Sequence, residues 1–278
     1  MLELLDREPR YYELLDATNF GAAYSEVKAA RRFDQAEELA RRWRTRFPDD
    51  RKSSIALAQS LRGRFNRRLP ALNRSRFDES IATLREAAEL LAGNDAVLLD
   101  ESVGELYRQS QADARLGELW DVLVSGEDHP AQLRFSIGTV LAVDGRSVEG
   151  RRRLQSAVDA APTLQVGWNN LAFAVDRGSP EETDAALAAA DVAVRLLPGD
   201  PSARDTRAEI RIRVGDADGA LEDLHVLREL GRNDPRLHGM FAQAYERQGR
   251  EDLAASHRAE AILMERRRVD VHPPLRPR

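Results

Sequence analysis

A pattern that returns about every 34 residues, the length of a pair of short helices with their turns, constrains the fold of this chain more than any other feature. The segments ESVGELYRQS and FSIGTVLAVDG start at 101 and 135, and GWNNLAFAV (167–175) continues their register. After two extra residues near 177–184, the pattern returns in DTRAEIRIRVGD at 205 and, one period later, in GMFAQAYERQG at 239. Such a period indicates stacked supersecondary units, and each unit here reads as helix, short turn and helix.

Each unit carries large and small apolar residues at fixed positions. The unit that spans 165–200 has these: Trp168, Leu171, Ala172 and Val175 in its first half, and Ala186, Ala193 and Pro198 in its second. Alanine or glycine at a helix crossing lets the two axes approach to roughly 8–10 Å. Neighbouring pairs then share one elongated core, which explains why aromatic residues make up only 6% of the chain.

This pattern resembles the tetratricopeptide repeat of bacterial-type arrays. Two further units carry its residues: Ile137, Gly138, Leu141, Gly150, Ala157 and Pro162 in one, and Phe241, Ala242, Tyr245, Ala254 and Ala261 in the other. The resemblance covers residues 17–268 of the 278. It implies an all-α fold, a right-handed superhelical solenoid of about seven helix–turn–helix repeats.

We therefore expect one solenoid domain with short segments at both ends. The expected repeats are 17–50, 51–96 with an arginine-rich insertion at 62–76, 97–130, 131–164, 165–200, 201–234 and 235–268. Residues 1–16 are expected to form a capping helix or segment, and residues 269–278 an extended Pro/Arg tail.

One repeat departs from the family pattern. Arg207 and Arg211 stand where apolar residues are expected in the unit at 201–234. Ile210 and Ile212 lie beside Arg211, and we expect them to make the apolar contacts that the family residue at that position would make.

Composition excludes several classes of protein. The net charge of −5 gives no global attraction to nucleic acid or anionic lipid, and lysine occurs only at Lys28 and Lys52. The absence of cysteine excludes disulfides and thiolate sites. No apolar run reaches the length of a membrane span, and the start lacks the features of a secretory signal. We expect a soluble, cytoplasmic protein that does not insert into membranes.

The two asparagines inside GWNNLAFAV point to a binding surface. At about 100° per residue, Trp168, Leu171 and Ala172 share one side of a helix, while Asn169 and Phe173 point the other way. The resemblance places this second side in a concave groove lined by the first helices. There Asn170 falls where the family often carries an asparagine that binds the backbone of a peptide. The alternative is that Asn170 bonds a neighbouring helix.

The predicted groove extends over several repeats. Its expected residues are Phe135, Thr139, Asn169, Asn170, Phe173 and Arg177, flanked by Glu101, Glu105, Asp205 and Glu209. Phe135 and Phe173 would form an apolar patch on a solvent-exposed face. The alternative is that both rings tuck under the next helix.

The clearest break in the period is the insertion LRGRFNRRLPALNRSRF (61–77). It has six arginines and no acid: Arg62, Arg64, Arg67, Arg68, Arg74 and Arg76. Insertions in solenoids usually fall on loops, so these cations could bind phosphates or an acidic partner. The alternative is a solvated loop, or arginines that pair with the acidic helices beside it.

No catalytic or metal-binding pattern appears in the sequence. There is no phosphate loop, nucleophile elbow or dinucleotide fingerprint, and the five histidines lack metal-ligand spacing. We predict a non-enzyme without cofactors: a scaffold or adaptor that binds a peptide or protein partner in the groove. Two alternatives stay open, a regulatory module that contacts nucleic acid or an acidic partner through the insertion, and the sensor part of a larger system.

Overall fold

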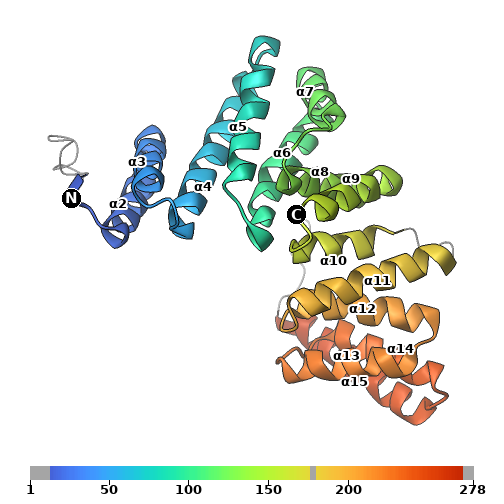
Figure 1. Cartoon of the computed structure of the whole chain (residues 1–278). Coiled ribbons are helices and arrows are strands. Elements are labelled where there is room, and N and C mark those ends of the chain that lie inside the picture. The colour runs from blue at the N-terminus through green and yellow to red at the C-terminus, as the bar shows by residue number, and fades with distance from the viewer. Residues whose placement is uncertain (1–12, 176–179, 272–278) are drawn as a thin grey trace. The chain divides into compact units, whose positions relative to one another are not determined.

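The computed structural model describes residues 13–175 and 180–271 and consists of helices throughout that part of the chain (Figure 1). Fourteen α-helices follow one another there as seven pairs, and no strand occurs among the described residues, which confirms the all-α prediction. The chain divides into an N-terminal unit, residues 1–164, and a C-terminal unit, residues 165–278.

The N-terminal unit contains four of the helical pairs. They are α2 (Ala17–Ala29) with α3 (Phe33–Arg46), α4 (Arg51–Arg68) with α5 (Phe77–Glu89), α6 (Asp100–Ser110) with α7 (Ala114–Ser125), and α8 (Ala131–Val143) with α9 (Ser147–Ala160). A 3₁₀ segment, η4 (Gly93–Leu99), precedes α6. The two helices of each pair pack against each other, and the first helices α2, α4, α6 and α8 pack in succession, so the core is continuous from α2 to α8.

The C-terminal unit contains the other three pairs. They are α10 (Gln165–Ala174) with α11 (Pro180–Leu196), α12 (Pro201–Val214) with α13 (Ala217–Glu229), and α14 (Pro235–Arg247) with α15 (Glu251–Val271). Because α15 continues to Val271, the first residues of the expected extended tail are helical. The rest of that tail, 272–278, and most of the expected N-terminal cap, 1–12, lie outside the described residues.

Aspartates at the helix starts set the boundaries of these pairs. Asp50 precedes α4 and its carboxylate accepts the backbone N–H of Lys52 at 2.9 Å. Asp200 accepts the N–H of Ser202 at 2.8 Å, and Pro201 follows it as the first residue of α12. An aspartate cap satisfies an N–H that the helix itself leaves unpaired, and proline at the next position loses nothing.

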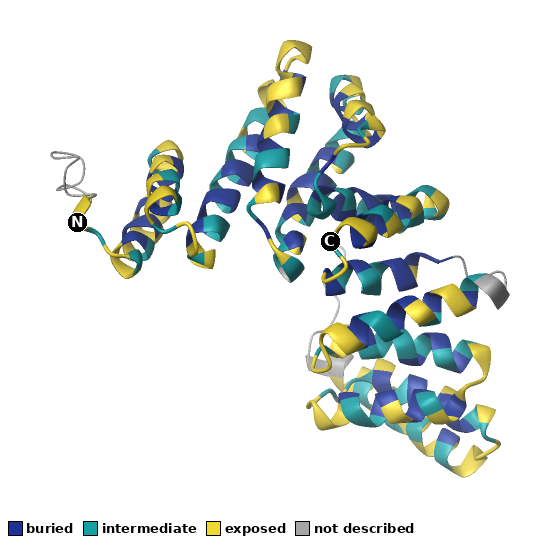
Figure 2. Cartoon of the chain, in the orientation of Figure 1, coloured by how far each residue is buried: buried dark blue, intermediate teal, exposed yellow. Residues whose placement is uncertain are grey.

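Small residues allow a close helix crossing between α8 and α9 in the N-terminal unit. A Cβ atom added at Gly150 of α9 would lie 2.6 Å from the backbone nitrogen of Ala142 and 2.8 Å from the carbonyl oxygen of Gly138, both on α8. Only glycine fits such a contact between two backbones. Figure 2 shows the buried residues along the inner sides of the pairs, with exposed residues on the outer sides.

The arginine-rich insertion is not a loop, contrary to expectation. Helix α4 has 18 residues against 13 in α8, so the extra residues extend the helix and carry Arg62 to Arg68 on it. Two short 3₁₀ segments, η2 (Leu69–Ala71) and η3 (Arg74–Arg76), then lead to α5. Leu61, Phe65 and Leu69 are buried, and this apolar spacing continues the helix beyond the repeat length.

Arg207 and Arg211 of α12 are accommodated by a carboxylate. Asp223 of α13 is 1% exposed and accepts bonds from both of them and from Arg204, at 2.6–3.1 Å. Ile210 and Ile212 are buried as expected, and Ile212 joins the core of the unit. The departure from the family pattern is therefore a change from apolar packing to a buried ion network.

Among the described helices, none combines the length and the apolar character that crossing a membrane requires.

Candidate binding face

The first helices of the C-terminal unit form a face with two adjoining hollows. Helix α12 packs beside both α10 and α14, which brings residues from three repeats together. One hollow has a volume of about 610 Å³ and lies between Phe173, Glu209 and residues of α14, among them Met240 and Gln243. The other, of about 390 Å³, extends from Phe173 to Asn169 and Asp205. We call this surface the α10–α12–α14 face.

Phe173 is the apolar residue at the junction of these hollows. Its side chain is 53% exposed, whereas Leu171, Ala172, Ala174 and Val175 are buried. The local sequence explains the contrast, because the buried residues of α10 lie on the side that packs against α11 and α12. A large ring that stays exposed beside a hollow is a feature of interaction surfaces.

Asn169 lies at the edge of the smaller hollow and contacts Asn170. The Asn169 Nδ2 group donates to Oδ1 of Asn170 at 3.4 Å. The Asn169 Oδ1 atom is buried and accepts no hydrogen bond from the described residues. An unused carbonyl oxygen beside Phe173 can accept an N–H from a bound chain.

Asp205 and Glu209 lie on this face, but arginines already balance their charges. Arg236 of α14 contacts Asp205 at 3.0 Å and Glu209 at 2.9 Å, and Arg232 also donates to Asp205. These two acids, which were predicted to flank the groove, therefore offer little net charge to attract basic ligand residues. The pKa of Arg232 is raised, since hydrogen bonds to Asp234 and Asp205 outweigh the opposing effect of burial.

Helix α14 and the turn before it contribute residues to this face that were not predicted. Arg232, Arg236, Met240 and Gln243 line the hollows, yet only acids and α10 residues were predicted there. The repeat period contains the signal, because Gln243 stands one full period after Glu209 and so occupies the equivalent position.

Phe135 does not belong to any exposed patch, which corrects the prediction. It is 0% exposed, and Ser136, Ile137 and Gly138 beside it are also buried. Helix α8 packs against α5, η4, α6 and α9, so its outward side is covered. Gln132 donates to the carbonyl of Leu91 at 2.9 Å, which places the end of α5 over that side. Thr139 of the same helix is partly buried.

The other predicted residues are dispersed. Glu101 and Glu105 lie on α6 of the N-terminal unit, where Arg62 contacts Glu101 at 2.6 Å and Arg108 contacts Glu105 at 2.5 Å. Arg177 lies outside the described residues. Within the C-terminal unit, the structure therefore brings together Asn169, Phe173, Asp205 and Glu209 from the predicted groove.

The arginines of the insertion pair with acids, as the alternative interpretation predicted. Arg64 contacts Glu37 at 2.9 Å, Arg68 contacts Glu79, and Arg67 lies 4.3 Å from the ring centroid of Phe33. Longer contacts join Arg67 to Asp34 and Arg74 to Glu118, both at 3.7 Å. Arg76 is exposed. Arg62, Arg64, Arg67 and Arg68 therefore lie on a helix and not in a phosphate-binding loop, and the nucleic-acid alternative stays a prediction.

A half-buried carboxylate lies next to this arginine helix. Ser136 donates to Oδ1 of Asp100 at 2.5 Å, and Arg62 donates to Ser102 at 3.2 Å. Burial raises the pKa of Asp100 to about 6, which the Ser136 hydrogen bond and the charge of Arg62 only partly oppose. The described residues contain no group of three or more histidines and carboxylates placed to hold a metal ion.

No family model matches the chain, and no curated protein does. Solved structures do: the crystal structure of MamA protein is 17% identical, covers 66% of this chain and 99% of that chain, and has a TM-score of 0.52. A MamA RS-1 double mutant is 16% identical with coverage of 64% and 99% and a TM-score of 0.51. At these identities the similarity concerns the fold alone, and it supports a tetratricopeptide-like repeat fold for this chain.

Proposed function

We propose that this chain is a non-catalytic protein-interaction scaffold, a bacterial-type tetratricopeptide protein that binds a partner segment on its α10–α12–α14 face. The observation that carries the proposal is Phe173, a ring 53% exposed at the junction of two hollows. A cytoplasmic location stays a prediction from the sequence.

The chemistry of the face defines the partner segment. An apolar side chain of the ligand would pack against Phe173 in the hollow that Met240 and Gln243 also line. A backbone N–H would donate to the Asn169 Oδ1 atom, which the described residues leave without a donor. Because Arg232 and Arg236 already balance the acids, we expect affinity to come from apolar burial and to depend weakly on salt.

The test uses peptides selected from a random displayed library on the full chain. We expect Phe173→Ala to weaken the best apolar peptide by about 2 kcal/mol, roughly 30-fold in Kd, since truncated hot-spot rings cost this much. Leu230→Ala is the matched control, because Leu230 is 50% exposed at the end of α13 and lines neither hollow. Equal affinities for wild type and Phe173→Ala would reject the proposal.

A further inference from the structure

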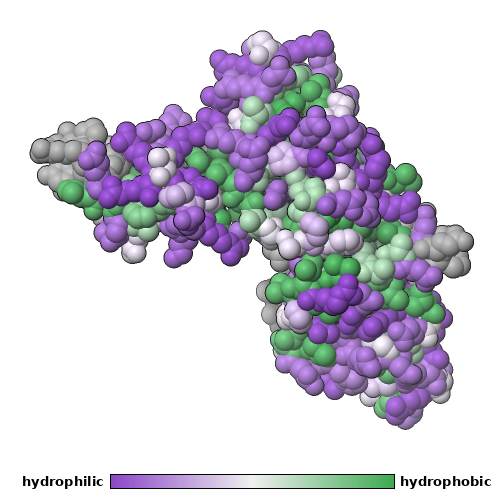
Figure 3. Space-filling view, in the orientation of Figure 1, coloured by the Kyte–Doolittle hydropathy of each residue, from purple (hydrophilic) through white to green (hydrophobic). Residues whose placement is uncertain are grey.

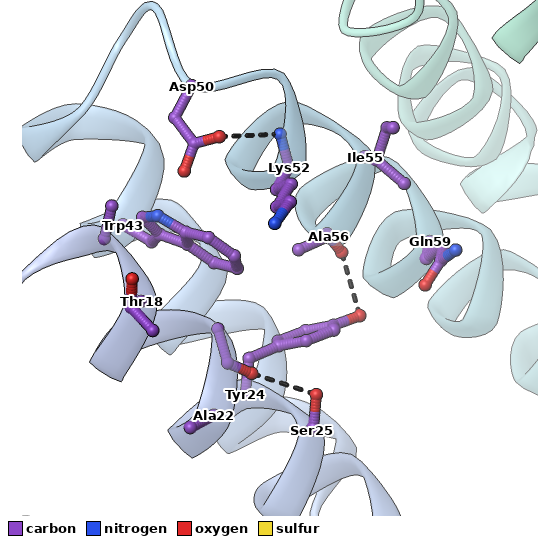
Figure 4. A pocket seen from close by; sticks show the side chains of 12 residues that line it. Thr18, Ala22, Tyr24, Ser25, Trp43, Asp50, Lys52, Ile55, Ala56 and Gln59 are labelled. Carbon is purple, nitrogen blue, oxygen red and sulfur yellow. Dashed lines mark hydrogen bonds between the residues drawn. The ribbon is translucent and has the colours of Figure 1, made fainter.

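A separate hollow in the N-terminal unit lies between the first two helical pairs. Its volume is about 610 Å³, and α2, the end of α3 and α4 line it (Figure 4). Tyr24, Trp43, Ile55 and Ala56 form its apolar part. No other described helix contributes to the lining, so the hollow is complete within this unit.

The apolar floor of this hollow is held in place by specific contacts. The Tyr24 hydroxyl donates to the carbonyl of Ala56 at 3.0 Å, which ties α2 to α4. The indole of Trp43 packs over Gly21, where an added Cβ would lie 3.1 Å from Cη2 of the ring. A floor fixed in this way is preorganised to receive a ligand side chain, which lowers the entropic cost of binding.

Lys52 lines this hollow, and Lys28, the other lysine of the sequence, contacts two of its lining residues. Figure 4 shows the Lys52 side chain directed into the space between Trp43 and Ala56. Its ammonium forms no ion pair within the described residues. Lys28 donates to Gln59, another lining residue, at 2.9 Å and lies 5.7 Å from the ring centroid of Tyr24. A flexible lysine can follow a ligand carboxylate, whereas arginines such as Arg64 and Arg207 are held in ion pairs.

Trp43 and Asp50 also carry polar groups at this hollow. Trp43 is 3% exposed, and its indole N–H has no hydrogen-bond partner among the described residues. Asp50 is the one acid in the lining, and its carboxylate is engaged by the backbone N–H of Lys52 at the positive N-terminus of α4. The hollow thus offers the Lys52 ammonium beside an apolar floor.

We propose that this hollow binds a peptide segment in which an apolar side chain stands next to an aspartate or glutamate. The apolar side chain would cover Trp43 and Tyr24, and the carboxylate would pair with Lys52. This site goes beyond the proposed function, since it lies in the other unit and selects a different ligand property, a negative charge.

The test measures binding of three labelled peptides to the full chain by fluorescence anisotropy. Each has leucine in a Gly/Ser background, flanked by glutamates, by glutamines or by lysines. We expect the glutamate peptide to bind at least about tenfold more tightly than the other two, and its affinity to fall with added salt. Lys52→Met should weaken the glutamate peptide about threefold to tenfold, while Lys52→Arg retains most of the affinity. Arg195→Gln, which removes an exposed cation from α11, should change nothing.

A second measurement locates the bound peptide without relying on a variant. The chain has three tryptophans, so its indole N–H groups give three NMR signals, which single Trp→Phe variants assign. The glutamate peptide should shift the Trp43 signal and leave those of Trp120 and Trp168 unchanged. Phe173→Ala should leave this binding intact, so the two sites can fail independently.

Three results would overturn the inference. The glutamate and glutamine peptides could bind equally, Lys52→Met could have no effect, or the Trp43 signal could stay in place. Residues 1–12 also carry acids among leucines. If the peptide bound only after these residues were deleted, the occupant would be this segment of the chain itself and the proposed partner in trans would be wrong.

Discussion

Both units consist of the same kind of helical pair. They differ in what covers their first helices and in how many arginines lie close to a buried carboxylate. In the N-terminal unit, α5, η4 and α6 cover α8, so Phe135 is buried, whereas α10 of the C-terminal unit leaves Phe173 half-exposed. Asp100 faces one nearby arginine and its pKa is raised to about 6, while three arginines surround Asp223. The repeat thus fixes the backbone, and the neighbours of each position decide whether a residue is core or surface. Figure 3 shows hydrophilic and apolar side chains interspersed on the visible surfaces.

Replacing Phe135 and Phe173 by alanine should give the largest difference in stability between the two units. Phe135→Ala should lower the free energy of unfolding by about 3–5 kcal/mol, because it leaves a cavity in a core that is fully closed. Phe173→Ala should change it by less than about 0.5 kcal/mol, the usual range for exposed positions. Urea unfolding followed by circular dichroism measures both. Equal losses in the two variants would show that α10 is as closely covered as α8.

Asp223→Ala should be nearly as damaging. It leaves Arg204, Arg207 and Arg211 as partly buried cations without their shared carboxylate, and breaking a buried pair from one side costs about 3–5 kcal/mol. The exposed Glu222 on the same helix provides the control variant Glu222→Ala. A loss no larger than that of the control would mean that the three arginines find solvent or other acceptors readily.

Asp100→Asn should have a smaller effect than Asp223→Ala and should increase the stability of the protein. A carboxyl group whose folded-state pKa is raised favours folding while it is protonated, and this contribution is lost as pH rises through about 6. Asparagine keeps an acceptor for Ser136 without the charge, so the variant should be more stable than wild type at pH 8 by on the order of 1–3 kcal/mol. Near pH 3 the difference should disappear. The test compares the unfolding midpoints of wild type and variant between pH 3 and pH 8. A variant that is less stable than wild type at pH 8 would contradict a raised pKa of Asp100.

Much of the fold could be predicted from the sequence, because the period and the small residues at helix crossings are local signals. The helical wheel around Asn169 also identified Phe173 as outward-facing. The burial of Phe135 could not be predicted from the same wheel, since the covering segment η4 lies outside its repeat and departs from the period. The arginine insertion was misread because extra length was assigned to a loop, whereas Leu61, Phe65 and Leu69 continue the apolar side of α4. The pairing of Asp205 with Arg236 depends on contacts between repeats that a single sequence does not reveal.

Hydrogen exchange of the full chain with the library-selected apolar peptide tests the proposed binding face most directly. We predict that the peptide slows amide exchange in α10, α12 and α14, the helices that line the two hollows, and that Phe173→Ala abolishes this protection. Protection confined to α11, α13 and α15, or protection that Phe173→Ala leaves unchanged, would contradict the account.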